Sequence, residues 1–128
     1  MSSNKLSAVD IVQSLKKGEI TCVELTKTFI EQIKNKEKDV GAWEYFNEEL
    51  VLNQAKKLDE DHQSGKIQGD LHGIPVGIKD IFDTEDMPTT DGTELHKKNP
   101  SWSDCTVVSK LKQAGAIIMG KTVTAELA

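Results

Sequence analysis

Apolar residues in the first half of the chain recur at the three- and four-residue spacing of amphipathic helices. The spacing predicts three helices, whose buried stripes are Val9, Val12 and Leu15; Leu25, Phe29, Ile30 and Ile33; and Val51, Ala55 and Leu58. The first helix is predicted from Ser7 as N-cap to Gly18, and the second from Thr21 as N-cap to about Lys36. The third is predicted from Asn47 as N-cap to the polar residues 59–69. Thr21 and Glu24 have the spacing of a capping box.

The pattern changes near Leu71, where glycines, prolines and short apolar runs replace the helical spacing. Residues 76–81 and 116–119 are predicted as strands, 40–46 as a short edge strand, and 87–92 as a turn or loop. Between the two later strands, a helix is expected from Ser103 as N-cap to Gly115, with Val107, Val108 and Leu111 facing inward. Strand, helix and strand form a βαβ unit, which predicts two parallel strands in one sheet.

The fold class is therefore α/β, in a single domain whose residues 1–69 are mainly helical and whose residues 70–128 form the strand-rich βαβ segment. The 128 residues are 37% hydrophobic and 29% charged, which is typical of a globular domain. No apolar run approaches the ~20 residues of a membrane span, and the polar start of the chain gives no signal peptide. We expect no membrane partner and a cytoplasmic location.

Charge argues against nucleic acid as a partner. The net charge is −5, and all 16 basic residues are lysines. Proteins that bind nucleic acid usually present a basic face and use arginine for bidentate contacts to phosphates and bases.

Lys79 is the residue to which chemistry is most readily assigned. It lies in the run from Leu71 to Asp80, which contains Gly73, Pro75 and Gly77 among apolar residues and predicts a buried strand. Burial of an ammonium group demands a partner or lowers the lysine pKa, and a lysine near neutrality can act as a base. The alternative is a side chain whose tip reaches solvent or pairs with a carboxylate at the strand end.

Residues 115–122 match the nucleotide-binding pattern G-x-x-x-x-G-K-[ST]. The context argues against that function, because a helix is predicted before Gly115 and the four middle residues are strand formers. Lys121 is then expected at a strand end, either near a substrate crevice or exposed. A nucleotide-binding module at Gly115–Thr122 stays open as an alternative.

Histidine and cysteine positions do not predict a metal site. His62, His72 and His96 lack the spacing of metal ligands, and neither Cys22 nor Cys105 lies near them in the sequence. His72 is predicted as a turn residue, with a role in lining a site as the alternative. The two cysteines are expected to be free thiols. We expect no metal and no other cofactor.

Several motifs, in order and spacing, resemble the amidase signature family over nearly the whole chain. They comprise Leu71 to Asp80; Phe82, Asp83 and Thr84; Met87 to Thr90 and Gly92; Ser103, Asp104 and 106–108; Leu111; 114–116; 120–122; Glu126 and Ala128; and, near the N-terminus, Gly18, Glu19, Thr21, Glu24 and Leu25. The chain is more similar to stand-alone amidases than to the A subunit of the tRNA-dependent amidotransferase, which usually has asparagine at the position of Ile81 and a different sequence at 123–125.

The resemblance implies a mixed sheet and a Ser–cis-Ser–Lys triad that hydrolyses amide C–N bonds, with Lys79 as the triad lysine and a small-molecule amide as substrate. The family's glycine- and serine-rich segment is absent, since no serine here lies in such a context. The chain is thus expected to be the N-terminal portion of an amidase, inactive alone, whose partner is the missing C-terminal part or a second chain. The alternative is a non-catalytic interaction or regulatory module.

Overall fold

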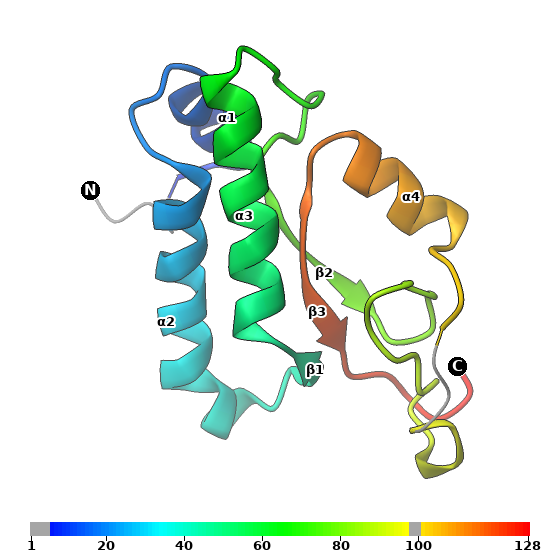
Figure 1. Ribbon diagram of the computed structural model, residues 1–128. Helices are drawn as coiled ribbons and strands as arrows, with labels where there is room; N and C mark the ends of the chain where they lie inside the picture. The colour runs from blue at the N-terminus through cyan, green and yellow to red at the C-terminus, as the bar shows by residue number, and fades with distance from the viewer. Residues whose placement is uncertain (1–5, 98–100) are drawn as a thin grey trace.

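A computed structural model describes residues 6–97 and 101–128, so Met1–Lys5, at the polar start of the chain, lie outside the described residues. The elements, in chain order, are α1 (Ala8–Lys16), α2 (Cys22–Val40), β1 (Trp43–Phe46), α3 (Glu48–Gln63), β2 (Pro75–Lys79), the 3₁₀ helix η2 (Glu94–His96), α4 (Thr106–Gln113) and β3 (Ile117–Thr122). Helices α1, α2 and α3 lie on one side of the strands and α4 on the other (Figure 1). This arrangement confirms the α/β class.

The three strands form one mixed sheet in the order β1-β3-β2. β3 is the central strand, parallel to β2 and antiparallel to β1, so the predicted βαβ unit and the predicted edge strand are confirmed. The register of β2 against β3 shifts between Val76, which pairs with Ile118, and Gly77, which pairs with Gly120. On the other side of β3, β1 pairs only with Gly120 to Thr122, so the side chain of Gln54 in α3 binds the backbone of Ile118 instead. It accepts from the Ile118 N–H at 2.9 Å and donates to its C=O at 3.0 Å.

The three N-terminal helices begin where the sequence predicts. Ser7, Thr21 and Asn47 are the N-caps, and Thr21 and Glu24 form the complete capping box. One helix end differs. α2 continues past Lys36 to Val40, because Gly41 supplies the left-handed residue (φ 60°) that ends it.

The predicted stripe of α1 is partly wrong. Val9 is 66% exposed, whereas Ile11 and Leu15 are buried and Val12 packs against the core. Ile11 and Leu15 are four residues apart, so they lie one above the other on the face that meets the core, and this rotates Val9 outward.

The expected N-cap of α4 is also wrong. The cap is Cys105 rather than Ser103, and Val107 is 50% exposed while Val108 is fully buried. Val108 and Leu111, three residues apart, form the stripe that meets the sheet. β3 extends beyond the predicted residues 116–119 to Thr122, because Gly120, Lys121 and Thr122 continue to pair with β1 and β2.

Each face of the sheet has its own apolar cluster. The larger one joins α1, α2 and α3 to Ile74, Ile117 and Met119. The smaller one packs Val108 of α4 and Met87 against Ile78 and Ile118. Among the helices of residues 6–97 and 101–128, none is long and apolar enough to cross a membrane.

Candidate functional site

Lys79 is the last residue of β2, and its side chain is exposed. The predicted strand is confirmed, but the prediction that it buries this lysine is wrong. Ile78 and Asp80 face the interior, whereas Lys79 shares the opposite face with Gly77, which is also exposed. In the described part of the chain, the Lys79 ammonium makes no hydrogen bond or ion pair.

Two glycines and a tryptophan form the surface beside Lys79. A Cβ atom on Gly77 would lie 3.2 Å from the Trp43 ring, and one on Gly120 would lie 3.0 Å from the same ring. The ring of Trp43 therefore lies directly against the backbone of β2 and β3, where only glycine leaves enough room. The face that carries Lys79 therefore has an aromatic ring beside the strand backbone.

The chain turns sharply after Lys79. Its carbonyl oxygen accepts hydrogen bonds from the N–H groups of Ile81 at 2.8 Å and Phe82 at 3.0 Å. The N–H of Asp80 still donates to the Thr122 carbonyl of β3 at 3.0 Å. The backbone on either side of Lys79 is thus held while its side chain points outward.

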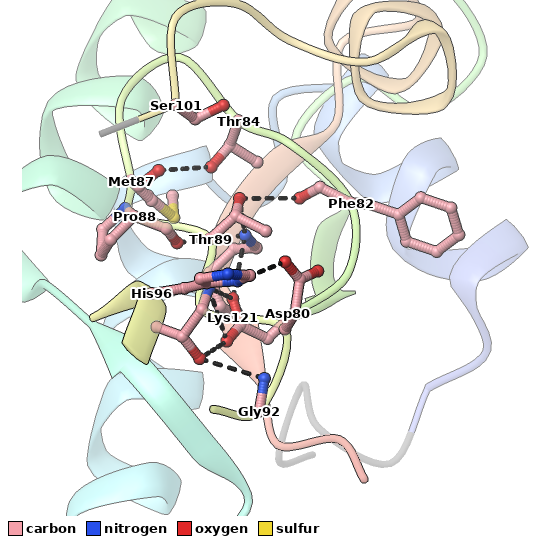
Figure 2. A network of polar contacts seen from close by, with 12 residues as sticks. Asp80, Phe82, Thr84, Met87, Pro88, Thr89, Gly92, His96, Ser101 and Lys121 are labelled. Carbon is pink, nitrogen blue, oxygen red and sulfur yellow. Dashed lines mark hydrogen bonds and ion pairs between the residues drawn. The ribbon is translucent and has the colours of Figure 1, made fainter. Parts of the chain in front are cut away.

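Directly behind this turn lies a buried ion pair. The Asp80 carboxylate and the Lys121 ammonium are both fully buried, with Nζ 3.1 Å from Oδ1 (Figure 2). The ammonium also donates to the Pro88 carbonyl at 3.1 Å and to the Thr89 hydroxyl at 2.8 Å. The carboxylate accepts from the N–H of Thr90, at 3.2 Å to its nearer oxygen, and from the Thr90 hydroxyl. Lys121 is therefore fully buried, and the expectation that it is exposed at a strand end is wrong.

The loop that follows Asp80 folds over this pair, as Figure 2 shows. The N–H of Asp91 donates to the Asp80 carbonyl at 3.0 Å, so the loop returns to the residue from which it leaves. Asp91 has a left-handed backbone (φ 52°), and its carboxylate lies 3.0 Å from Nδ1 of His96. Inside the loop, the Thr84 hydroxyl donates to the Met87 carbonyl at 3.1 Å. The pair is enclosed by backbone and threonine hydroxyls.

Residues 115–122 do not form a phosphate loop. Residues 117–122 are the central strand, paired with β2 from Ile117 to Thr122 and with β1 from Gly120 to Thr122, so this extended backbone cannot curl around an anion. Gly115 has φ 89°, and a Cβ there would lie 2.1 Å from the Gln68 carbonyl oxygen, so this glycine serves a close backbone contact. The structure contradicts the nucleotide-binding alternative.

Of the three histidines, His72 is the one that the structure buries. It is a turn residue, as predicted; its Nδ1 accepts from the Gln68 N–H at 3.2 Å, while Nε2 has no partner within the described chain. Burial, and then the nearby charge of His62, lower the pKa of His72. Within residues 6–97 and 101–128, no group of three or more His, Cys, Asp or Glu side chains is arranged to hold a metal ion.

The buried network was not predicted from the sequence. Lys79 was singled out as a lysine in an apolar strand, but the same signal is stronger at Lys121, which follows the run from Ala116 to Met119. Recognition of a nucleotide-binding pattern there obscured the simpler interpretation that this lysine needs a buried carboxylate.

Comparisons with known proteins agree on one family. Residues 24–128 match the family model described as Amidase. The A subunit of the glutamyl-tRNA(Gln) amidotransferase of Rhodopirellula baltica is 38% identical over 122 residues, which are 95% of this chain and 24% of that protein. The putative amidase AmiD of Mycobacterium bovis is 31% identical over 123 residues, which are 96% of this chain and 26% of that protein. These sequence identities therefore give no support to the expectation that the chain is more similar to stand-alone amidases than to the amidotransferase A subunit.

The fold comparison points the same way. The crystal structure of the peptide amidase from Stenotrophomonas maltophilia superposes with a TM-score of 0.90 at 27% identity, over 97% of this chain and 26% of that one. The chain spans about a quarter of the length of these relatives. The family match over residues 24–128, together with this shared fold, shows that the chain belongs to the amidase family.

Proposed function

We propose that this chain contributes the lysine of a Ser–cis-Ser–Lys triad to an amidase that hydrolyses C–N bonds, and that Lys79 is this lysine. The observation that carries the proposal is that the Lys79 side chain is available while its backbone is fixed. Lys79 is exposed and has no partner in the described chain, yet the backbone on both sides of it is hydrogen-bonded. A base must be held in place but left available for a second group.

In this mechanism, the Lys79 amine takes a proton through the middle serine, and the second serine attacks the amide carbonyl carbon. The C–N bond breaks, the departing nitrogen takes a proton, and an acyl-enzyme ester remains. Water then attacks the ester and releases the acid, which restores the serine. Hydrogen-bond donors of the serine segment stabilise the oxyanion at both steps.

Both serines would come from the larger part of the domain, which the relatives possess beyond the quarter that this chain matches. That part is either a continuation of the same polypeptide or a second chain. The substrate is a small amide, and no cofactor or metal takes part. The cytoplasm is the proposed compartment, which fits the two free thiols of Cys22 and Cys105.

The decisive experiment joins the 128 residues to the remaining three quarters of the Rhodopirellula baltica relative and measures ammonia or amine release from a panel of small amides. Lys79→Ala should lower turnover by about 10⁴-fold or more, as loss of other triad members does. Lys66→Ala, which removes an exposed loop lysine, is the matched control and should leave turnover unchanged. Turnover in Lys79→Ala equal to that of the control would refute the proposal.

The isolated chain should show no turnover, because its lysine has no serine to activate. Hydrolysis by the purified 128 residues that is abolished by Lys79→Ala would contradict this part of the proposal.

An interaction module without catalysis is the second candidate, and an apolar groove favours it. The groove, of about 410 Å³, lies between α1, α2 and the sheet, and its lining includes Phe29, Ile33, Trp43 and Pro75. Size-exclusion chromatography and thermal unfolding of the isolated chain separate the two candidates. A monomer that melts cooperatively indicates an independent module, whereas aggregation indicates a part that needs the remaining amidase domain.

A further inference from the structure

We propose that the buried Asp80–Lys121 pair is a positioning device for Lys79, which fixes the end of β2 so that the Lys79 amine points in one direction. The inference rests on the proposed function of Lys79. It assigns a role to two charged residues that are fully buried.

The argument begins with chain geometry. Lys79 and Asp80 are adjacent in a nearly extended segment, so their side chains point to opposite faces of the sheet. Lys79 pairs in register with Thr122, and the preceding residue, Ile78, pairs with Lys121. The carboxylate of Asp80 therefore reaches inward to Lys121 just where Lys79 reaches outward. Any rotation of the backbone at Asp80 would also redirect Lys79.

The contacts of the pair bind three separate segments together. Lys121 belongs to β3, Asp80 follows β2, and Pro88, Thr89 and Thr90 belong to the loop. The Lys121 ammonium has three acceptors, which equals the number of its N–H bonds. The carboxylate receives the Lys121 ammonium together with the N–H and the hydroxyl of Thr90. Such a network has one satisfied arrangement, and so it selects a single geometry for the strand end.

Stability alone does not account for charges at this place. Apolar residues already fill the same face earlier in the two strands, at Ile78 before Asp80 and at Ile118 before Lys121. Replacement of a buried ion pair by apolar side chains of similar volume is often neutral or stabilising. Charges that bring no net stability but demand fixed partners suit a site where the direction of a side chain matters more than the stability of the fold.

The test uses the double variant Asp80→Leu/Lys121→Met, which leaves no unpaired charge and so has the best prospect of folding. In the joined enzyme, we expect kcat to fall about 100-fold, as expected for a displacement of the reacting amine of about 1 Å, while KM stays within about twofold. Lys112→Met is the matched control. Lys112 ties the same loop to α4 through an ion pair of 3.3 Å with Asp86, but its side chain reaches solvent, and kcat should not change.

A second measurement does not depend on activity. Hydrogen exchange of the isolated chain should show about tenfold lower protection of the Asp80 and Asp91 amides in the double variant, while the Leu25 and Val51 amides in α2 and α3 keep their protection. Unchanged kcat in a folded double variant, or unchanged protection at Asp80 and Asp91, would overturn the proposal. If the joined wild-type protein is inactive, the proposed function fails, and hydrogen exchange still decides whether the pair holds the strand end.

Discussion

The two faces of the sheet are held by different kinds of contact. On the face covered by α1, α2 and α3, apolar side chains such as Leu25, Val51 and Ile117 make up the interior. Each of these residues is at most 1% exposed. At the ends of β2 and β3 on the other face, the interior is polar, with the Asp80–Lys121 pair at its centre. The first face is covered by three helices that support one another. The second has a smaller apolar cluster under α4 and, at the strand ends, a few hydrogen bonds with fixed partners.

This difference sets how each face responds to change. Apolar packing loses stability in proportion to the volume removed, and neighbouring side chains partly fill the gap. A buried ion pair loses far more when one partner is removed, because the remaining charge stays in the interior without compensation. The strand end should therefore be the most sensitive region of the chain to a single substitution.

Lys121→Met provides the largest expected effect. It leaves the Asp80 carboxylate buried without a cation, so the free energy of unfolding should fall by about 4 kcal/mol, within the range for breaking a buried pair. Urea denaturation followed by circular dichroism measures this. The double variant with Asp80→Leu should recover most of the loss. A loss below about 1 kcal/mol for the single variant would mean that the pair is not the centre of this region.

Leu25→Ala tests the helical face with the next largest effect. Leu25 is 1% exposed, and its truncation should lower the free energy of unfolding by about 3 kcal/mol, through lost burial and the cavity that remains. The same denaturation experiment applies, with the exposed Val9→Ala as control, which should change stability by less than about 0.5 kcal/mol. If Leu25→Ala costs clearly more than Lys121→Met, the ranking of the two faces is reversed.

The helical face is also the region that the sequence predicted best. Periodic apolar residues, N-cap side chains and glycines act locally, so the spacing of Leu25 and the capping box of Thr21 were sufficient to place α2. The errors occurred where local signals were ambiguous. In α1, Val9 has the same helical spacing to Val12 as a buried residue would have, and in α4 Val107 is adjacent to Val108. Only the packing of each helix shows that Val9 and Val107 face solvent.

The strand-end region could not be derived from periodicity. Lys79 and Lys121 both occupy ends of apolar strands. The apolar run before Lys121 is the stronger signal of burial, but nothing in the local sequence identifies the carboxylate that pairs with it. The answer depends on the bulge in β3 and on the loop that brings Pro88 and Thr89 over the sheet, and both are tertiary features. The resemblance to the amidase family singled out Lys79 but gave no sign of the network behind it.

The pH dependence of stability should report on the helical face through His72. Burial and the charge of His62 lower the pKa of His72 in the folded state, so below its usual value of 6.5 the unfolded chain binds a proton that the folded chain does not. Stability from this group is therefore complete above pH 6.5 and lost as the pH falls below it, with a slope of at most about 1.4 kcal/mol per pH unit. Urea denaturation at several pH values measures the slope.

The variant His72→Gln should reduce this slope, since it removes the titrating ring. His96→Gln is the control, because His96 belongs to η2 and its partly exposed ring lies beside Asp91, 3.0 Å from its carboxylate. An equal slope in His72→Gln and in the wild type would show that the loss below pH 6.5 comes from other groups.

Thr21→Ala should give the smallest loss, about 1 kcal/mol, although it removes a complete capping box. The loss is limited because the Asp59 carboxylate of α3 accepts from the N–H groups of Cys22 at 2.7 Å and Val23 at 3.0 Å, so the start of α2 keeps acceptors. Denaturation measures the loss, with Glu31→Ala on the exposed surface of the same helix as control.

The pH dependence of the same variant adds a second test. Hydrogen bonds from the Thr21 backbone and side chain lower the pKa of Glu24, so this group contributes stability that is lost as the pH falls below the usual range for glutamate. In Thr21→Ala, that acid-side loss should become smaller, because the hydroxyl no longer supports the carboxylate. A variant that loses several kcal/mol would show that α2 depends on a single cap. The helical face would then be as sensitive to one substitution as the strand end, and the contrast between the two faces would disappear.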